Sequence, residues 1–412
     1  MSKIFEILLN KQIINYFEEN SLFSKCQFGF RSSHSTIELV TNFIKCCIES
    51  FENNYLVTSR FFDLSKAFDT VSHDTLIKKL GFYGFHADSL KLLNSYLCDR
   101  YQSVHLRGYD SSYRLVNHGV PQGSVLGPVL FIIYINDLPA YIRDECLEPF
   151  LFADDIAVQF SHSDKDILHM KLDNTSDKIH KWCRDNYLSL NHQKTVDIMF
   201  STSHISDSSE RFLGIQIEAG LGWRSHTDHI SKKMNKGIFM LRILRQSVSR
   251  QTLKTVYYAH VHSHLSYGTL LWGNHGSARQ VFILQKRSVR LICGVHSKTH
   301  CKPLFVELGI LTLPSMFVLA CLLYVKENID DYQICTNIHS YPTRNCSNIY
   351  IRKCKYSRTT NSFVYISVQL FNSLPQEVKN LSISVFARKV KATLRANPLY
   401  SVDEFYNLEW TQ

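Results

Sequence analysis

Three aspartates lie at the ends of apolar segments, where their carboxylates could hold divalent metal ions. Asp63 follows the first apolar residues of FFDLSKAFDTV, and Asp154 and Asp155 lie between the two apolar runs of FLFADDIAVQF. Carboxylates at the ends of buried strands can share two ions about 4 Å apart, because the sheet fixes their spacing. Such a site favours phosphoryl transfer with Mg²⁺. An isolated Asp-Asp pair more often marks only a hairpin turn, and Asp63 alone could be a solvent-facing strand end.

The apolar patterns around these aspartates predict alternating helices and short strands. The expected strands cover residues 56–64, 150–153, 156–160, 195–201 and 211–217. The expected helices cover 35–53, 73–81, 87–98 and 164–188, with a long apolar helix from Gly123 and a hairpin through 104–106 and 113–116. This order favours an α+β fold with a small, largely antiparallel sheet.

The charge is distributed unevenly along the 412 residues, whose net charge is +10. Residues 221–412 hold 25 of the 46 basic residues but only 9 of the 36 acidic residues. An acidic front half suits a metal site and a basic back half suits a polyanion, although basic surfaces often only face solvent. We therefore predict a domain boundary near Gly220–Gly222, followed by a mainly helical region.

Other features exclude some classes of protein. No segment approaches the roughly 20 apolar residues of a membrane helix. The first 20 residues predict an amphipathic helix without a signal-peptide cleavage site. Twelve cysteines without a repeating spacing are expected to be reduced thiols, so we expect a protein of the nucleus and cytoplasm without a membrane partner. Four possible zinc ligands lie close together in the sequence: Cys293, His296, His300 and Cys301. They make a poor zinc site, because the adjacent side chains of His300 and Cys301 point apart.

Five motifs in order resemble the reverse transcriptase of jockey-like non-LTR (LINE) retrotransposons. They are FFDLSKAFDTV, GVPQGSVLGPVLFIIYINDL, FADD, WCRDNYLSLNHQKT and FLGI. QFGFRSSHST upstream, and QKRSVRLICG and FNSLPQEVKN downstream, are also similar to this family, so the resemblance covers nearly the whole chain. It implies an RNA-directed DNA polymerase with a right-hand palm. Such an enzyme extends a DNA primer on an RNA template, using dNTPs and two Mg²⁺ ions, with Mn²⁺ as a possible substitute.

The resemblance also implies an order of domains. The expected parts are partial fingers (1–55), a palm (56–220), a helical thumb-like region (221–327) and a C-terminal extension (328–412). Because the upstream fingers and the endonuclease of full-length elements lack counterparts, we expect a truncated copy. The alternative to an active polymerase is an inactive relic that only binds RNA or RNA–DNA hybrid. An aspartyl phosphatase would need Asp-x-Asp where Asp63-Leu64-Ser65 stands.

The same motifs imply roles for individual residues in catalysis. Asp63 matches the first metal-binding aspartate, and Asp154 and Asp155 match the catalytic pair. Lys194 matches the lysine that protonates the leaving pyrophosphate, although it could equally be an exposed lysine before an edge strand. Phe68 matches the aromatic gate that leaves no room for a ribose 2′-hydroxyl, although it could also be a core aromatic.

Further positions match residues that contact the substrates. Gln122 and Gly123 match the turn at the incoming nucleotide, and Arg31 lies where it could face the template or triphosphate. The expected primer grip is Phe212, Leu213 and Gly214, and the expected nucleic-acid contacts are Lys286, Arg287 and Arg290. Two polar residues of the first motif, Asp69 and His73, are expected to cap the helix that follows.

Overall fold

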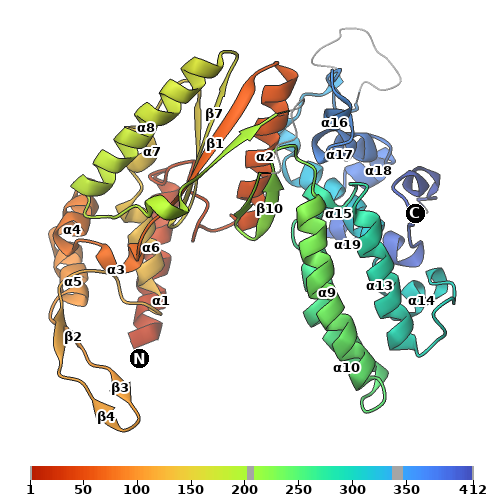
Figure 1. Ribbon diagram of the computed structural model, residues 1–412, viewed down its shortest axis with the longest axis horizontal. Coiled ribbons are helices and arrows are strands. Elements are labelled where there is room, and N and C mark those ends of the chain that lie inside the picture. The colour runs from red at the N-terminus through yellow and green to blue at the C-terminus, as the bar shows by residue number, and fades with distance from the viewer. Residues whose placement is uncertain (1, 202–207, 336–346, 411–412) are drawn as a thin grey trace. The chain divides into compact units, whose positions relative to one another are not determined.

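The protein is described by a computed structural model that covers residues 2–201, 208–335 and 347–410 (Figure 1). The chain forms two compact units, Met1–Leu213 and Gly214–Gln412. The first is a mixed α+β unit with small antiparallel sheets, as predicted, and the second is mainly helical. The finer division into fingers, palm, thumb-like region and extension remains a prediction.

The first unit is built on a four-stranded antiparallel sheet in the order β6-β7-β1-β8. The strands are β1 (Leu56–Asp63), β6 (Leu147–Phe152), β7 (Asp155–His162) and β8 (Val196–Phe200). All four were predicted from the sequence, with small shifts at their ends. The two central strands, β1 and β7, are largely buried, and their register places Asp63 directly opposite Asp155. The sheet core therefore fixes the backbone that carries these aspartates.

Helices cover both faces of this sheet (Figure 1). Helix α2 (Thr36–Glu52) places Phe43 against Phe61 and Phe150 on one face, while α8 (Lys165–Asp185) covers the other. The remaining helices of the unit are α1 (Ser2–Glu19), α3 (Ala67–Thr70), α4 (His73–Phe82), α5 (Ala87–Leu97), α6 (Leu126–Tyr134), α7 (Leu138–Tyr141) and the 3₁₀ turn η1 (His192–Lys194).

The apolar segment after Gly123 forms two helices, α6 and α7, where one long helix was predicted. Continuing the helix would bring the ring of Pro139 against the carbonyl of Ile135, so α6 ends at Tyr134 and α7 begins only at Leu138. Buried Asn136 fixes this break, since its amide donates to the Leu22 carbonyl and its oxygen accepts from the Ser24 N–H. The sequence correctly predicted an apolar helix here, but the prediction overlooked that Pro139 would break it.

Two pairings differ from the prediction. Residues 113–116 were expected to pair with 104–106, but β5 (Arg114–Val116) pairs with β2 (Arg100–Gln102). Strands β3 (His105–Leu106) and β4 (Tyr109–Asp110) instead pair with each other across Arg107 and Gly108, which both have positive φ. The expected strand 211–217 is interrupted by left-handed Leu213 and Gly214 and forms β9 (Ser209–Phe212) and β10 (Ile215–Glu218).

The second unit is mainly helical, as expected beyond residue 222. Its helices are α9 (Arg224–Leu244), α10 (Arg250–Tyr257), the π-helical turn η2 (Tyr258–His262), α11 (Ser263–Ser266), α12 (Thr269–Trp272), α13 (Ala278–Cys293), α14 (Lys302–Leu308), α15 (Leu313–Glu327), η3 (Ile329–Asp331), α16 (Ser357–Thr360), α17 (Phe363–Asn372), α18 (Gln376–Lys379), α19 (Ile383–Ala396) and η5 (Asp403–Asn407). No single helix in the described part of the chain is long and apolar enough to cross a membrane. Helices α14 and α15 reach that length and apolar composition only when taken together, and they are bent by 59° at the break between them.

Candidate active site

Three carboxylates gather at one end of the central strands. Asp63 ends β1, Asp155 begins β7, and Asp154 lies in the two-residue turn that joins β6 to β7. Residues paired directly across antiparallel strands point to the same face, with Cβ atoms about 4.5–5.5 Å apart. The register therefore brings together the aspartates of two motifs that are about ninety residues apart in the sequence.

The negative charges of these three carboxylates repel one another. Burial raises the pKa of Asp155 to about 6, and the charges of Asp154 and Asp63 add to the increase. Burial also raises the pKa of Asp154, with a further contribution from Asp63. This repulsion would be relieved by a cation, and an all-oxygen donor set fits Mg²⁺. Within the described ranges, no three Asp, Glu, His or Cys side chains already form a cluster that could hold a metal ion. The carboxylates would therefore have to turn toward a shared ion.

Lys194 forms an ion pair with Asp63. Its ammonium nitrogen lies 3.2 Å from Asp63 Oδ2. The η1 turn that carries it is fixed to the end of β1, because the Asn191 N–H donates to the Asp63 carbonyl at 2.8 Å. The same asparagine side chain accepts from the Gln193 N–H and caps the turn. The NHQKT motif is thus held beside the first aspartate.

An open cleft of about 310 Å³ lies beside Asp63, Asp155 and Lys194. Two charged residues of β9, Glu210 and Arg211, also line it, although neither was predicted as a site residue. They immediately precede the FLGI motif, which is the only sequence signal that could have drawn attention to them. The other lining residues are Phe61, Phe62, Ile156, Val196 and Phe212.

The expected nucleotide-contacting residues lie on two connected segments. Half-buried Phe68 stacks on Phe131, with ring centroids 4.5 Å apart. The Phe68 carbonyl accepts from the Val120 N–H at 2.8 Å, and the Gln122 amide donates to Asp69 Oδ1 at 2.7 Å. These two bonds join the PQG loop to α3. Phe68 therefore packs on the core and also lies next to the segment that carries Gln122.

The loop around Gln122 is open above its backbone. Gly123 adopts φ +80°, a conformation that side chains rarely take, and no atom lies within 4 Å of the position of a Cβ. The following helix α6 has no N-cap side chain of its own. Buried Glu6 of α1 replaces it, since its carboxylate accepts from the Val125 N–H at 2.8 Å and the Leu126 N–H at 3.4 Å. Glu6 was not predicted to support this loop.

The expected helix caps were wrong. The Ser72 side chain caps α4 by accepting from the Thr75 N–H. Asp69 instead accepts from Gln122, and His73 Nε2 lies 2.8 Å from the Gly119 carbonyl oxygen. Serine is as good a cap as aspartate and lies one residue before the helix, so Asp69 is free to bind the PQG loop.

Arg31 is fully engaged within the first unit. Its guanidinium makes a two-pronged ion pair with Glu18, at 2.9 and 2.8 Å, and donates to the carbonyls of Ser24 and Gln27. Only 11% of its side chain is exposed. Contact with a template or triphosphate would require these bonds to break, so we do not include Arg31 in the proposed site.

The expected primer grip and nucleic-acid contacts lie in different environments. Phe212 is buried against Phe43 and Phe61 in the first unit, and Leu213 and Gly214 form a left-handed turn. On α13, the Lys286 ammonium lies over the ring of Phe282, Arg290 donates to the Thr299 carbonyl, and Arg287 is exposed. Of these three cations, Lys286 and Arg290 are therefore engaged within the protein, while Arg287 faces solvent.

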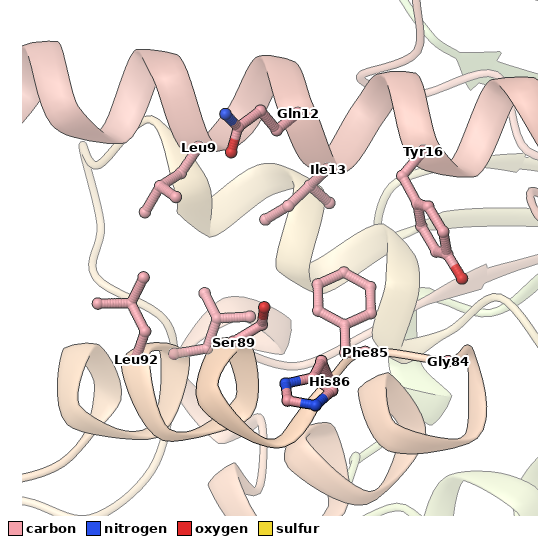
Figure 2. A pocket seen from close by; sticks show the side chains of 10 residues that line it. Leu9, Gln12, Ile13, Tyr16, Gly84, Phe85, His86, Ser89 and Leu92 are labelled. Atoms are coloured by element: carbon pink, nitrogen blue, oxygen red, sulfur yellow. The ribbon is translucent and has the colours of Figure 1, made fainter.

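A second pocket, of about 240 Å³, lies between α1 and α5 (Figure 2). Leu9 and Ile13 of α1 and Leu92 of α5 line it, together with Tyr16 and Phe85. None of its lining residues is an aspartate, glutamate, lysine or arginine. It lacks the charges that a triphosphate or its metal ions would need, so we do not regard it as the nucleotide site.

The sequence is similar to a known family and to curated proteins. Residues 3–217 match the family described as reverse transcriptase (RNA-dependent DNA polymerase). The chain is 30% identical over 317 residues to a probable RNA-directed DNA polymerase from transposon BS of Drosophila melanogaster, covering 71% of this chain and 35% of that protein. It is 25% identical over 317 residues to the RNA-directed DNA polymerase from mobile element jockey of the same organism, covering 71% and 34%. The chain thus spans about a third of the length of these relatives.

Solved structures of telomerase also match the chain. Telomerase from Candida tropicalis in complex with a telomeric RNA fragment gives a TM-score of 0.46 at 12% identity, covering 98% of this chain and 56% of that one. The apo telomerase of the same organism gives 0.45 at 14% identity, covering 75% and 53%. The family match covers more than half of this chain and includes all three aspartates and Lys194. As the jockey-like motifs indicated, the chain belongs to the reverse transcriptase (RNA-dependent DNA polymerase) family.

Proposed function

We propose that this chain is the polymerase part of a non-LTR retrotransposon protein and adds deoxynucleotides to a primer 3′-hydroxyl on an RNA template. The observation that carries the proposal is the cross-strand pairing of Asp63 with Asp155, with Asp154 in the adjoining turn. The family match and the similarity to jockey-type polymerases support the same chemistry. The first unit then corresponds to a right-hand palm with partial fingers.

Asp63, Asp154 and Asp155 are the residues that would hold two Mg²⁺ ions, or Mn²⁺ in their place. When bound, such ions activate the attacking hydroxyl and neutralise charge on the leaving pyrophosphate. Lys194 supplies a proton to that pyrophosphate, a role supported by the position of its ammonium beside Asp63. The mutual repulsion of the three carboxylates favours the binding of cations between them.

The remaining roles concern selection and grip. The Phe68 ring forms a wall that excludes a 2′-hydroxyl, and Gln122 with Gly123 faces the incoming dNTP. The turn at Phe212, Leu213 and Gly214 holds the primer end. In the thumb-like region, Lys286, Arg287 and Arg290 bind nucleic-acid phosphates, and the bond to the Thr299 carbonyl holds the Arg290 side chain.

Primer extension on poly(rA)/oligo(dT) with Mg²⁺ and dTTP tests the proposal. The purified chain is expected to extend the primer, and Asp154→Ala is expected to abolish extension while hybrid affinity stays within about twofold. The excess of basic residues in 221–412 favours a second candidate, a protein that binds RNA or hybrid without copying it. Hybrid binding without extension would support that candidate, and extension by Asp154→Ala would refute the assigned site.

A further inference from the structure

A buried glutamine contacts the turn that carries the catalytic aspartates. Gln27 is only 1% exposed, although its side chain is polar. Its Oε1 accepts from the Gly29 N–H at 2.7 Å and from the Ala153 N–H at 3.2 Å. Gly29 lies two residues further along, whereas Ala153 belongs to the turn between β6 and β7. One side-chain oxygen therefore joins two segments that are 126 residues apart.

The backbone around Gln27 extends the edge of the sheet. Strand β6 is the edge strand, and residue 27 forms a parallel bridge with Leu151. The Phe28 N–H donates to the Leu151 carbonyl, and the Leu151 N–H donates to the Cys26 carbonyl, both at 2.9 Å. This short added strand ends beside Ala153, so Gln27 is held in place by backbone bonds on either side.

The turn needs such support. Ala153 adopts φ +53°, an unfavourable conformation for a residue with a side chain, and it is 3% exposed. Without the glutamine oxygen, its buried N–H would lose its partner. A Cβ on Gly29 would lie 2.5 Å from the Ala153 nitrogen, so only glycine allows the two backbones to approach this closely. Asp154 and Asp155 follow Ala153 directly.

The amide nitrogen of Gln27 does not add a hydrogen bond to those of its oxygen. Gln27 Nε2 is buried and has no hydrogen-bond partner within the described ranges. An unpaired buried donor is unfavourable, so this side chain is not optimised for stability alone. Its stabilising bonds are concentrated on the oxygen, which means that they act on Gly29 and on the catalytic turn.

We infer that Gln27 is a positioning residue for the polymerase reaction. By holding the Ala153 N–H, it keeps the left-handed turn that sets the direction of the Asp154 and Asp155 carboxylates. Loss of the oxygen would release the turn without removing any group that touches nucleic acid. The inference rests on the proposed polymerase function for its effect on rate, but the hydrogen bond itself can be tested without activity.

The direct test is hydrogen–deuterium exchange at the Ala153 amide of the full chain. In the wild type this amide should be strongly protected, although it lies at the tip of a two-residue turn. Gln27→Met, which keeps the size but removes the acceptor, should speed its exchange at least tenfold. Gly29→Ala should do the same by pushing the segment away. Rapid exchange of Ala153 in the wild type would overturn the inference, whatever the variants do.

The matched control is Gln159→Met on β7. Gln159 is 3% exposed, lies in the same sheet, and donates to Cys47 Sγ at 2.7 Å, so its loss also removes a buried hydrogen bond. Gln27→Met should lower the single-turnover rate at least tenfold and raise the half-saturating Mg²⁺ concentration, with hybrid affinity within twofold. Gln159→Met should lower thermal stability while leaving the Mg²⁺ requirement unchanged.

The outcomes separate the two claims. Equal effects of Gln27→Met and Gln159→Met on rate and Mg²⁺ requirement would reduce Gln27 to a structural residue and contradict the inference. If the wild type did not extend a primer, the proposed function would fail. Even then, protection of the Ala153 amide from exchange that is lost in Gln27→Met would establish that Gln27 holds the turn by its hydrogen bond.

Discussion

The ammonium nitrogen of Lys194 lies 3.2 Å from Asp63 Oδ2 and joins two motifs that are 131 residues apart. The lysine side chain is 65% exposed and the aspartate side chain 37% exposed. Ion pairs this exposed contribute about 0.2–1 kcal/mol to folding, because water screens them and the side chains lose entropy. The contact therefore contributes little to stability, and its proposed role lies in the chemistry at Asp63.

Replacement of Lys194 should separate these two effects. Lys194→Ala is expected to lower the free energy of unfolding by less than about 1 kcal/mol. If Lys194 donates the proton to pyrophosphate, single-turnover nucleotide addition should fall by about 10²–10⁴-fold. Rapid-quench kinetics and urea unfolding measure the two quantities. Lys181→Ala on α8 serves as the control, and a rate loss of less than threefold in Lys194→Ala would remove Lys194 from the mechanism.

The hydrogen bond from Gln122 to Asp69 predicts coupling between the PQG loop and α3. If Asp69 holds Gln122 ready for the incoming nucleotide, Asp69→Ala should raise KM for dTTP several-fold, as Gln122→Ala should. Because the two residues act through one bond, the double variant should resemble Gln122→Ala alone. The expected coupling energy in kcat/KM is on the order of 1 kcal/mol.

A double-mutant cycle under steady-state conditions measures this coupling. Asp74→Ala provides a matched control, since Asp74 is an exposed aspartate in the first turn of α4. It should leave KM unchanged and should add independently to Gln122→Ala. Simple additivity of Asp69→Ala and Gln122→Ala would show that their hydrogen bond does not prepare the loop for nucleotide binding.

The position of Phe68 predicts its effect on sugar selection. Its ring is half-buried on Phe131, so one edge remains available beside the PQG loop. Phe68→Ala should lower the ratio of kcat/KM for dTTP over UTP at least tenfold, because the wall facing the 2′-hydroxyl is removed. Both nucleotides are compared on the same enzyme, so lost stability cancels. Phe68→Tyr, which keeps the ring, should preserve the ratio, and unchanged selectivity in Phe68→Ala would argue against a gate.

The local elements could be predicted from the sequence because their signals are local. Apolar runs predicted the strands that end at Asp63 and begin at Asp155. The order of the motifs assigned Lys194 to the same site as these aspartates, and the family match covers all of them. The pairing of β1 with β7 joins segments about ninety residues apart, so the local pattern of either strand could not reveal which residues lie opposite each other. The register of the 100–116 hairpin was wrong for a different reason, since the tight turn at Arg107 and Gly108 pairs β3 with β4 and this local signal was overlooked.

The supporting residues were not found because their partners are distant in the sequence. Glu6 caps α6 from 119 residues away, and Gln27 reaches Ala153 from 126 residues away. A buried polar side chain gives no periodic signal, so only its three-dimensional partners identify it. Arg31 shows the converse. Its motif suggested a ligand contact, whereas its guanidinium is occupied by Glu18 and two carbonyls.

A buried histidine in the second unit has a lowered pKa. His226 is 2% exposed and lies near Trp223 and Trp272, while its Nδ1 accepts from the Gln216 N–H at 3.2 Å. Burial lowers its pKa to about 4, and the neighbouring charges of His229 and Lys233 contribute in the same direction. The imidazole is therefore neutral in the folded protein over most of the pH range.

Protonation in the unfolded chain should then reduce stability as the pH falls. An unfolded histidine has a pKa of about 6.5, so the unfolded state binds the proton first. The stability contributed by neutral His226 is complete above pH 6.5 and is lost progressively as the pH falls toward 4, by about 3 kcal/mol in total. His226→Gln keeps an acceptor but cannot be protonated, so its free energy of unfolding should fall less over this range. Urea unfolding followed by tryptophan fluorescence measures the difference. His296→Gln, at an exposed histidine, should follow the wild type, and parallel losses in His226→Gln and the wild type would refute the assignment.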